Sequence, residues 1–176
     1  MIWLVRHGQT DYTLAGKLQG RLDTYLNEAG RKQDFKIAAQ VRSTNFDIIF
    51  CSPLKRAKET CEIILNNNGH IGMLMVDDRI VERDYGEFVG TLRTRFDDFG
   101  WKINQKFERA ETMLDLEKRV FAFLKDIEQK YKDKNILVVG HGAVNAVAMT
   151  YFEGRPAGGD YLHLIKDTGT LVSYQF

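Results

Sequence analysis

The sequence has few of the residues that build secreted frameworks or membrane spans. Two of its 176 residues are cysteines, Cys51 and Cys61, too few for the disulfide framework of a small secreted protein. No apolar run approaches the roughly 20 residues that a membrane-spanning helix needs, and the apolar run 1–5 is followed at once by Arg6 instead of a small-residue cleavage site. We therefore expect a cytoplasmic protein whose two thiols are reduced and packed in the core.

The chain also lacks an excess of charge of either sign. Its 25 lysines and arginines against 24 acidic residues give a formal net charge of +1. Such a protein has no long-range field to attract nucleic acid or an anionic membrane, so neither is an expected partner. Any affinity for an anion must come from a few locally placed side chains.

Proline is scarce, and no low-complexity linker or internal repeat divides the chain. The length and the apolar content of 44% suit one globular domain. We expect a single domain over residues 1–176. Residues 91–110 carry mixed signals, which suit a short lid or substrate loop and equally an ordinary surface connection.

Short apolar runs alternate with amphipathic segments along the chain. The runs predict strands at 2–5, 47–51, 73–76 and 136–139. Because these runs are nearly uninterrupted, each strand should be covered on both faces. Helical spacing predicts helices at 28–42 after Asn27, 53–65, 112–132 with Thr112 as N-cap, and 143–151, and alternation predicts an edge strand at 169–176. The pattern predicts the α/β class, with a mainly parallel central sheet between two helical layers.

Two histidines follow predicted strands in the same way. His7 lies between Arg6 and Gly8 after the first strand, and His141 precedes Gly142 after the fourth. In open α/β sheets the ligand crevice lies beyond the carboxyl ends of the strands, so both imidazoles can converge there.

A third strand end adds an arginine. Ser52 and Pro53 predict a helix start, with Ser52 as N-cap and Pro53 as the first helical residue, which places Arg56 in the opening turn. Helix N-termini attract anions, and a guanidinium matches phosphate oxygens. The sequence shows no ligand spacing typical of a metal site, so we expect a phosphate site without a metal or cofactor.

Histidine can accept a phosphoryl group when a neutral ring nitrogen faces phosphorus. The leaving alkoxide then needs a proton, and a carboxylic acid that is partly desolvated beside a phosphate is suited to supply it. Glu82 is the candidate, with Asp84 and Glu87 in the same stretch as alternatives.

These residues lie in blocks that resemble the histidine phosphatase (phosphoglycerate mutase-like) superfamily. The blocks are 6–10, 19–23, 52–60, 82–90 and 138–142, in the order of the family, and they span almost the whole chain. The resemblance implies a phosphoglycerate mutase-like fold and a metal-independent phosphatase that hydrolyses a small phosphate monoester through a phosphohistidine on His7. It implies that Arg6, Arg56 and His141 assist catalysis at the phosphate and that Glu82 is the acid. The implied phosphate and substrate contacts are Arg6, Gly8, Thr13, Gln19, Gly20, Arg56, His141 and Gly142; Thr13 stands where the family often has asparagine.

Two other functions remain open: a phosphoglycerate mutase, and a phospho-ligand binding protein whose catalysis has lapsed. Mutases of this superfamily are usually longer, with a proline-rich basic insertion after the acid block, whereas Pro53 and Pro156 are the only prolines here and neither lies there. The implied nucleophile, acid, arginines and second histidine are all present, so nothing indicates lost activity. The expected partner is a small phosphorylated metabolite, and the oligomeric state stays open.

We expect structural roles for the remaining histidines and for the aromatic residues of 91–110. His70 and His163 have no partner block and should be structural or solvated. The aromatic residues should pack in the core instead of lining a substrate pocket; they are Phe96, Phe99, Trp101 and Phe107.

Overall fold

The computed structural model describes residues 1–69 and 72–176, and five strands of this part form one sheet in the order β3-β2-β4-β1-β5. The strands are β1 (Ile2–Arg6), β2 (Ile48–Cys51), β3 (Met73–Val76), β4 (Ile136–Gly140) and β5 (Thr170–Tyr174). The pairs β1–β4, β2–β4 and β2–β3 are parallel, and β5 runs antiparallel to β1 at one edge. The predicted mainly parallel sheet and the final edge strand are confirmed.

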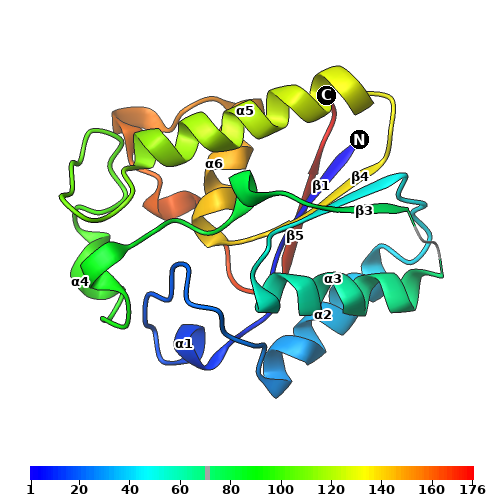
Figure 1. The fold of residues 1–176 in the computed structure, drawn as a ribbon, viewed down its shortest axis with the longest axis horizontal. Helices are drawn as coiled ribbons and strands as arrows, with labels where there is room; N and C mark the ends of the chain where they lie inside the picture. The colour runs from blue at the N-terminus through cyan, green and yellow to red at the C-terminus, as the bar shows by residue number, and fades with distance from the viewer. Residues whose placement is uncertain (70–71) are drawn as a thin grey trace.

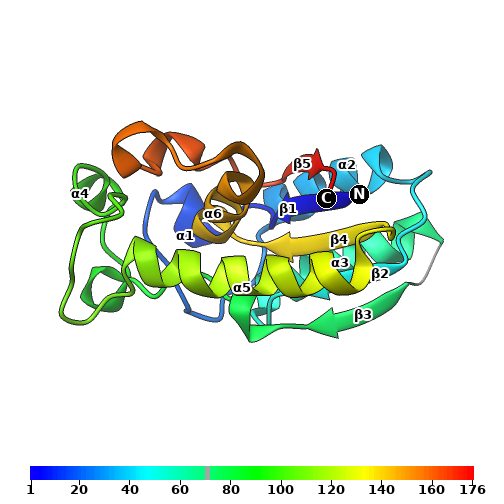
Figure 2. The same cartoon turned by 90° about the horizontal axis from the view of Figure 1, so that it is seen from above.

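Helices cover both faces of the sheet, which gives three layers (Figures 1 and 2). The long helices are α2 (Glu28–Gln40), α3 (Lys55–Asn68), α5 (Met113–Tyr131) and α6 (Gly142–Glu153). Successive side chains of a strand point to opposite faces, so Leu137 and Val139 of β4 pack with α2 and α3, while Ile136 and Val138 pack with α5 and α6. This is the predicted α/β sandwich.

Shorter elements connect these layers. Two are brief α-helices, α1 (Asp11–Leu14) and α4 (Thr94–Asp97). Within the described residues four more are short 3₁₀ segments, at Asp78–Ile80, Gly86–Phe88, Ala157–Gly159 and Leu162–Leu164. In the part of the chain that the structure describes, no helix is long and apolar enough to cross a membrane.

Side-chain caps start two of the long helices where the sequence predicts. The Asn27 side chain accepts a hydrogen bond from the amide of Gly30 at 2.9 Å, and the Thr112 hydroxyl accepts one from the amide of Asp115 at 3.1 Å. Each bond satisfies a first-turn amide that has no partner inside its helix. Both predicted N-caps are confirmed.

The predicted start of α3 is wrong by two residues. The residue before the helix is Leu54, in extended conformation and without a side-chain cap, and Lys55 is the first helical residue. Ser52 precedes the helix by three residues; its buried hydroxyl accepts from the amide of Leu54 at 3.4 Å and lies 2.7 Å from Nε2 of His141. Arg56 still lies in the opening turn, as expected.

The prediction that strand 73–76 is covered on both faces is also wrong. β3 lies at the open edge of the sheet, next to β2 alone, and its four side chains are 37–62% exposed. The long helices lie over the central strands, as Figure 2 shows, and leave this edge uncovered. A short apolar run predicts a strand, but it does not reveal how many neighbours that strand has.

The segment 91–110 is fastened to the chain by a buried arginine. The guanidinium of Arg83 lies within 5.7 Å of the ring centres of Tyr85, Phe96, Trp101 and Phe107, a geometry that favours cation–π attraction. It also donates to the carbonyl of Gly100 at 2.6 Å. Phe96 and Trp101 are buried, and Phe99 and Phe107 pack half-buried against the core. The expected core packing of these aromatic residues is confirmed, but Trp101 also lines the cavity described below, which the prediction had excluded.

Candidate active site

The predicted site residues gather where three parallel strands end. His7 follows β1, His141 follows β4, and Arg56 stands in the first turn of α3 after β2. The two imidazole rings lie 5.1 Å apart between centroids, and all three side chains are buried. The parallel strands therefore bring together residues that are up to 134 positions apart.

Hydrogen bonds fix the protonation of His7. A carbonyl oxygen can only accept, so the 2.7 Å contact with the oxygen of Gly8 places the proton on Nδ1. Nε2 is then the free acceptor, and Nε of Arg56 donates to it at 3.2 Å. Burial, followed by the charges of Arg56 and Arg6, lowers the pKa of His7 well below its ordinary value. At neutral pH His7 is a neutral imidazole with an unprotonated Nε2.

Arg56 holds the loop that faces His7. Its terminal nitrogens donate to the carbonyls of Leu22 and Gly20, each at 2.7 Å. Burial lowers the pKa of Arg56 to about 10, which leaves it cationic at neutral pH. Gly20 has a φ of +51°, in the left-handed region where a side chain is strained, so glycine suits the position that offers this carbonyl.

His141 begins the second helix that contributes to the site. Its Nε2 lies 2.7 Å from the Ser52 hydroxyl, while its Nδ1 is buried and has no hydrogen-bond partner among the described residues. Burial, then the charges of Arg56 and His7, lowers its pKa well below the ordinary value. At the next residue, a Cβ on Gly142 would lie 3.0 Å from Cζ of Arg6, so glycine lets this helix end approach the guanidinium.

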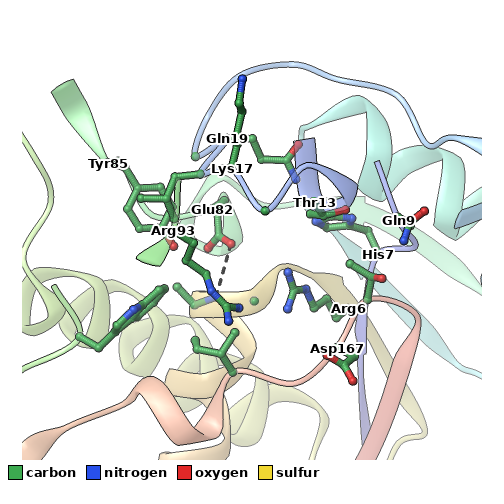
Figure 3. A pocket seen from close by; sticks show the side chains of 18 of the residues that line it. Arg6, His7, Gln9, Thr13, Lys17, Gln19, Glu82, Tyr85, Arg93 and Asp167 are labelled. Atoms are coloured by element: carbon green, nitrogen blue, oxygen red, sulfur yellow. Dashed lines mark hydrogen bonds between the residues drawn. The ribbon is translucent and has the colours of Figure 1, made fainter. Parts of the chain in front are cut away.

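A cavity of about 490 Å3 lies beside these groups, and Figure 3 shows side chains that line it. Its lining includes seven of the predicted residues, namely Arg6, His7, Thr13, Gln19, Gly20, Glu82 and Gly142. Gly8, Arg56 and His141 are buried behind this lining instead of facing the open space. The predicted residues therefore form one cluster in two layers, one that faces the cavity and one buried behind it. His7 of the first layer contacts Arg56 of the second.

Glu82 is held with its carboxylate at the cavity. Oε1 accepts from its neighbour's amide, Arg83 N, at 2.9 Å, and Oε2 accepts from Ala143 N, in the first turn of α6, at 3.4 Å. The side chain is almost buried and lies across the cavity from His7 in Figure 3. The two alternatives in the same stretch, Asp84 and Glu87, do not line the cavity.

Thr13 and Gln19 are committed to local hydrogen bonds. The hydroxyl of Thr13 donates to the carbonyl of Thr10 at 3.0 Å and accepts from the Thr10 amide at 2.9 Å, which closes the capping box of α1. The side-chain oxygen of Gln19 accepts from the hydroxyls of Thr10 and Thr24 at 3.0 and 2.9 Å. The Gln19 amide nitrogen is thus the group left to donate toward the cavity.

The cavity wall also includes charged residues that no sequence motif assigns to the site. Lys17 and Arg93 reach it because 16–18 and 90–93 run side by side, with Arg93 N donating to Gly16 O at 2.8 Å. Asp167 reaches it from the segment before β5. Arg93 could be noticed only as one cation in a basic stretch, and neither Lys17 nor Asp167 lies in a motif that predicts a site.

The remaining histidines and the two cysteines lie away from the cavity or outside the described residues. His163 is exposed, and both cysteines are buried and unpaired, as expected; His70 lies outside the described residues. Over 1–69 and 72–176 no group of three histidine, cysteine or carboxylate side chains is placed to hold a metal ion.

Comparison with known proteins agrees with this geometry. The profile described as histidine phosphatase superfamily (branch 1) matches residues 2–176. The uncharacterized phosphatase PhoE of Bacillus subtilis is 38% identical over 154 residues, which cover 87% of this chain and 77% of PhoE. Phosphoserine phosphatase 1 of Hydrogenobacter thermophilus is 30% identical over 148 residues, 78% of this chain and 69% of that enzyme. The solved structure of YhfR from Bacillus stearothermophilus superposes with a TM-score of 0.85 at 25% identity, covering 97% of this chain and 88% of YhfR.

Proposed function

This chain belongs to branch 1 of the histidine phosphatase superfamily and is a phosphatase, and we propose that His7 carries the phosphoryl group between its two chemical steps. The observation that supports this role most directly is the hydrogen bond from Nδ1 of His7 to the Gly8 carbonyl. It leaves Nε2 as a neutral nucleophile at the cavity, opposite the carboxyl group of Glu82.

In the first step Nε2 of His7 attacks the phosphorus atom of a monoester. The P–N bond forms as the P–O ester bond breaks, and the electron pair of that bond leaves with the alkoxide oxygen. Glu82, as the carboxylic acid, gives its proton to this oxygen, so an alcohol departs and Glu82 is left as a carboxylate. Arg6 and the amides at the start of α6 are placed to stabilise the negative charge on the phosphoryl oxygens.

In the second step the roles reverse. The Glu82 carboxylate takes a proton from water, and the water oxygen attacks phosphorus as the P–N bond breaks. Inorganic phosphate is released, His7 recovers its lone pair, and Glu82 recovers its proton. The lone pair of Nε2 that accepts from Nε of Arg56 is the pair that forms the P–N bond, so this hydrogen bond is given up as His7 attacks and returns when phosphate leaves, while the other nitrogens of Arg56 stay on Gly20 and Leu22.

We further propose that the substrate is a small phosphorylated metabolite. A cavity of about 490 Å3 accommodates a small monoester. Lys17 and Arg93 on one wall and Asp167 on another give the space beyond the phosphate both signs of charge, which suits a polar leaving group. Residues 91–110, which contribute Arg93, Thr94 and Trp101, act as the substrate wall of the single domain.

A phosphate-monoester screen tests the function. It is run with a chelator present, beside an assay for the interconversion of phosphoglycerates. Release of inorganic phosphate that the chelator does not change supports the phosphatase proposed here. Interconversion of phosphoglycerates faster than phosphate release would instead make the protein a mutase, and binding without turnover would make it a phospho-ligand binding protein.

A further inference from the structure

Asp34 is a fully buried carboxyl group that the proposed chemistry does not use. It lies on α2, and its Oδ2 accepts from the Gly8 amide at 3.2 Å and from the Thr60 hydroxyl at 2.6 Å. Its Oδ1 is buried and has no hydrogen-bond partner in the described part of the chain. A buried carboxyl group without a cation bonded to it is costly, so its position calls for a reason.

The first contact of Asp34 is part of a two-residue clamp. Gln33 accepts from the amide of Gln9 at 2.8 Å, so consecutive side chains of α2 hold consecutive backbone amides after His7. The packing is tight as well, because a Cβ on Gly8 would lie 2.3 Å from the oxygen of Gly30 at the start of α2. Helix α2 therefore sets the path of the backbone that supplies the Gly8 carbonyl to Nδ1 of His7.

The second contact of Asp34 reaches the helix that carries Arg56. The Thr60 hydroxyl lies 2.6 Å from Asp34 Oδ2 and 2.9 Å from the carbonyl of Arg56, one turn earlier in α3. Arg56 in turn donates to Nε2 of His7. Asp34 thus lies between the two segments whose hydrogen bonds reach the two ring nitrogens of His7.

We propose that Asp34 is a positioning residue: its carboxylate holds the Gly8 backbone against α3, and so keeps His7 in the tautomer that exposes Nε2 toward phosphorus. The proposal rests on the proposed role of His7 as the nucleophile. Asp34 itself lies beneath the cavity and touches neither substrate nor the reacting atoms.

The charge of Asp34 should change within the working pH range. Burial raises its pKa to about 7, against the lowering by the Thr60 and Gly8 hydrogen bonds. The charged group that faces it from α3 is Glu59, which raises the pKa further and is itself paired with Arg31 of α2 at 2.6 Å. On the side of β1 the facing titratable group is His7, beyond Gly8. An ionised carboxylate accepts hydrogen bonds more strongly than a neutral acid, so the hold on Gly8 should strengthen as the pH rises through about 7.

The test follows the imidazole nitrogens of His7 by 15N NMR on the full chain. In the parent, the ring should stay neutral with the proton on Nδ1, and its nitrogen signals should shift with an inflection near pH 7 as Asp34 titrates. Asp34→Asn, which is neutral at every pH, should remove that inflection. Asp34→Ala, which lacks the acceptor, should shift the ring toward the Nε2–H tautomer.

Activity supplies the second readout. At pH 8, kcat/KM of Asp34→Asn should fall about fivefold, as expected when a charge-assisted hydrogen bond becomes a neutral one, and the ratio of variant to parent should approach one at pH 6. Variant and parent act on the same substrate, so the titration of the substrate phosphate affects both alike and cancels in the ratio of their kcat/KM values. Glu117→Gln, which neutralises a buried carboxylate bonded to Arg155 and Tyr161, is the matched control and should leave the ratio constant with pH.

The outcomes separate this inference from the proposed function. If His7→Ala abolishes turnover while both Asp34 variants fold and keep the parent's His7 signals and pH profile, the positioning role is lost and the nucleophile stands. If His7→Ala retains turnover, the proposed role of His7 as the nucleophile is wrong, and the inference about Asp34 loses its basis. Should the variants not fold, a parent His7 signal without an inflection near pH 7 overturns the inference by itself.

Discussion

Nε of Arg56 donates to Nε2 of His7 across 3.2 Å, so the atom proposed to attack phosphorus faces a cation. This contact opposes protonation of the ring and steers Nε2 without occupying the cavity, where Arg6 and Glu82 line the open side. Before the attack the ring is therefore held at Nε2 by an arginine and at Nδ1 by a backbone carbonyl. Each of these contacts leads to a measurable expectation.

Replacing His7 by alanine removes the only group that we propose to bond to phosphorus. Turnover should fall at least about 1,000-fold, the order expected for loss of a covalent nucleophile. An acid-labile phosphoenzyme, detected by rapid quench and intact mass, should form in the parent and be missing in the variant. His163→Ala, at an exposed histidine, is the control and should match the parent.

Arg56→Lys keeps a charge but loses the planar fork that reaches Gly20, Leu22 and His7 together. We expect kcat/KM to fall about 100-fold and the unfolding free energy to fall by about 2 kcal/mol, because a single ammonium cannot replace the donors to both backbone carbonyls and to His7. Steady-state kinetics and chemical denaturation measure the two effects, and inhibition by inorganic phosphate should weaken as well. Arg42→Lys, an exposed arginine, controls for the substitution itself, and an unchanged Arg56 variant would remove Arg56 from the proposed site.

Glu82→Gln should show a defect that depends on the leaving group. Hydrolysis of alkyl phosphates, whose alkoxide needs a proton, should slow by about 100- to 10,000-fold. Phosphoenzyme formation from an activated aryl phosphate should be spared, because the phenolate departs unaided. Single-turnover rates with both substrates make the comparison.

The neighbouring carboxylates provide the controls for Glu82. Glu87→Gln and Asp84→Asn should both behave as the parent, because neither side chain lines the cavity. If one of them showed the selective loss with alkyl phosphates instead, the acid would be that residue and Glu82 would be wrongly assigned.

Stability should fall in mild acid because two histidines are buried in the neutral form. The pKa values of His7 and His141 are lowered well below 6.5 in the folded chain, whereas unfolded histidines titrate near 6.5. Below pH 6.5 the two histidines bind more protons in the unfolded state, which outweighs the one proton that the folded state takes up at Asp34, so the unfolding free energy decreases as the pH falls. Denaturant titrations at pH 7.5, 6.5 and 5.5 measure this slope, and His141→Asn should reduce it. An unchanged slope would show that His141 titrates alike in both states.

Much of the fold and of the proposed site follows from the sequence. Asn27 and Thr112 mark helix starts because their side chains satisfy amides only a few residues away. His7 and His141 converge because each follows a strand, and parallel strands present their carboxyl ends at one edge of a sheet. Such inferences need only local chemistry and the geometry of one layer.

Other features depend on contacts between distant segments, which local patterns do not encode. The exposure of β3 follows from its place at the sheet edge, and the hydroxyl of Ser52 turns to His141 because β2 and β4 are neighbours. Nothing in the residues around Asp34 shows that its carboxyl group lies beneath Gly8. Burial and partner choice belong to the packed structure, because a side chain loses its water only when elements from elsewhere in the chain cover it.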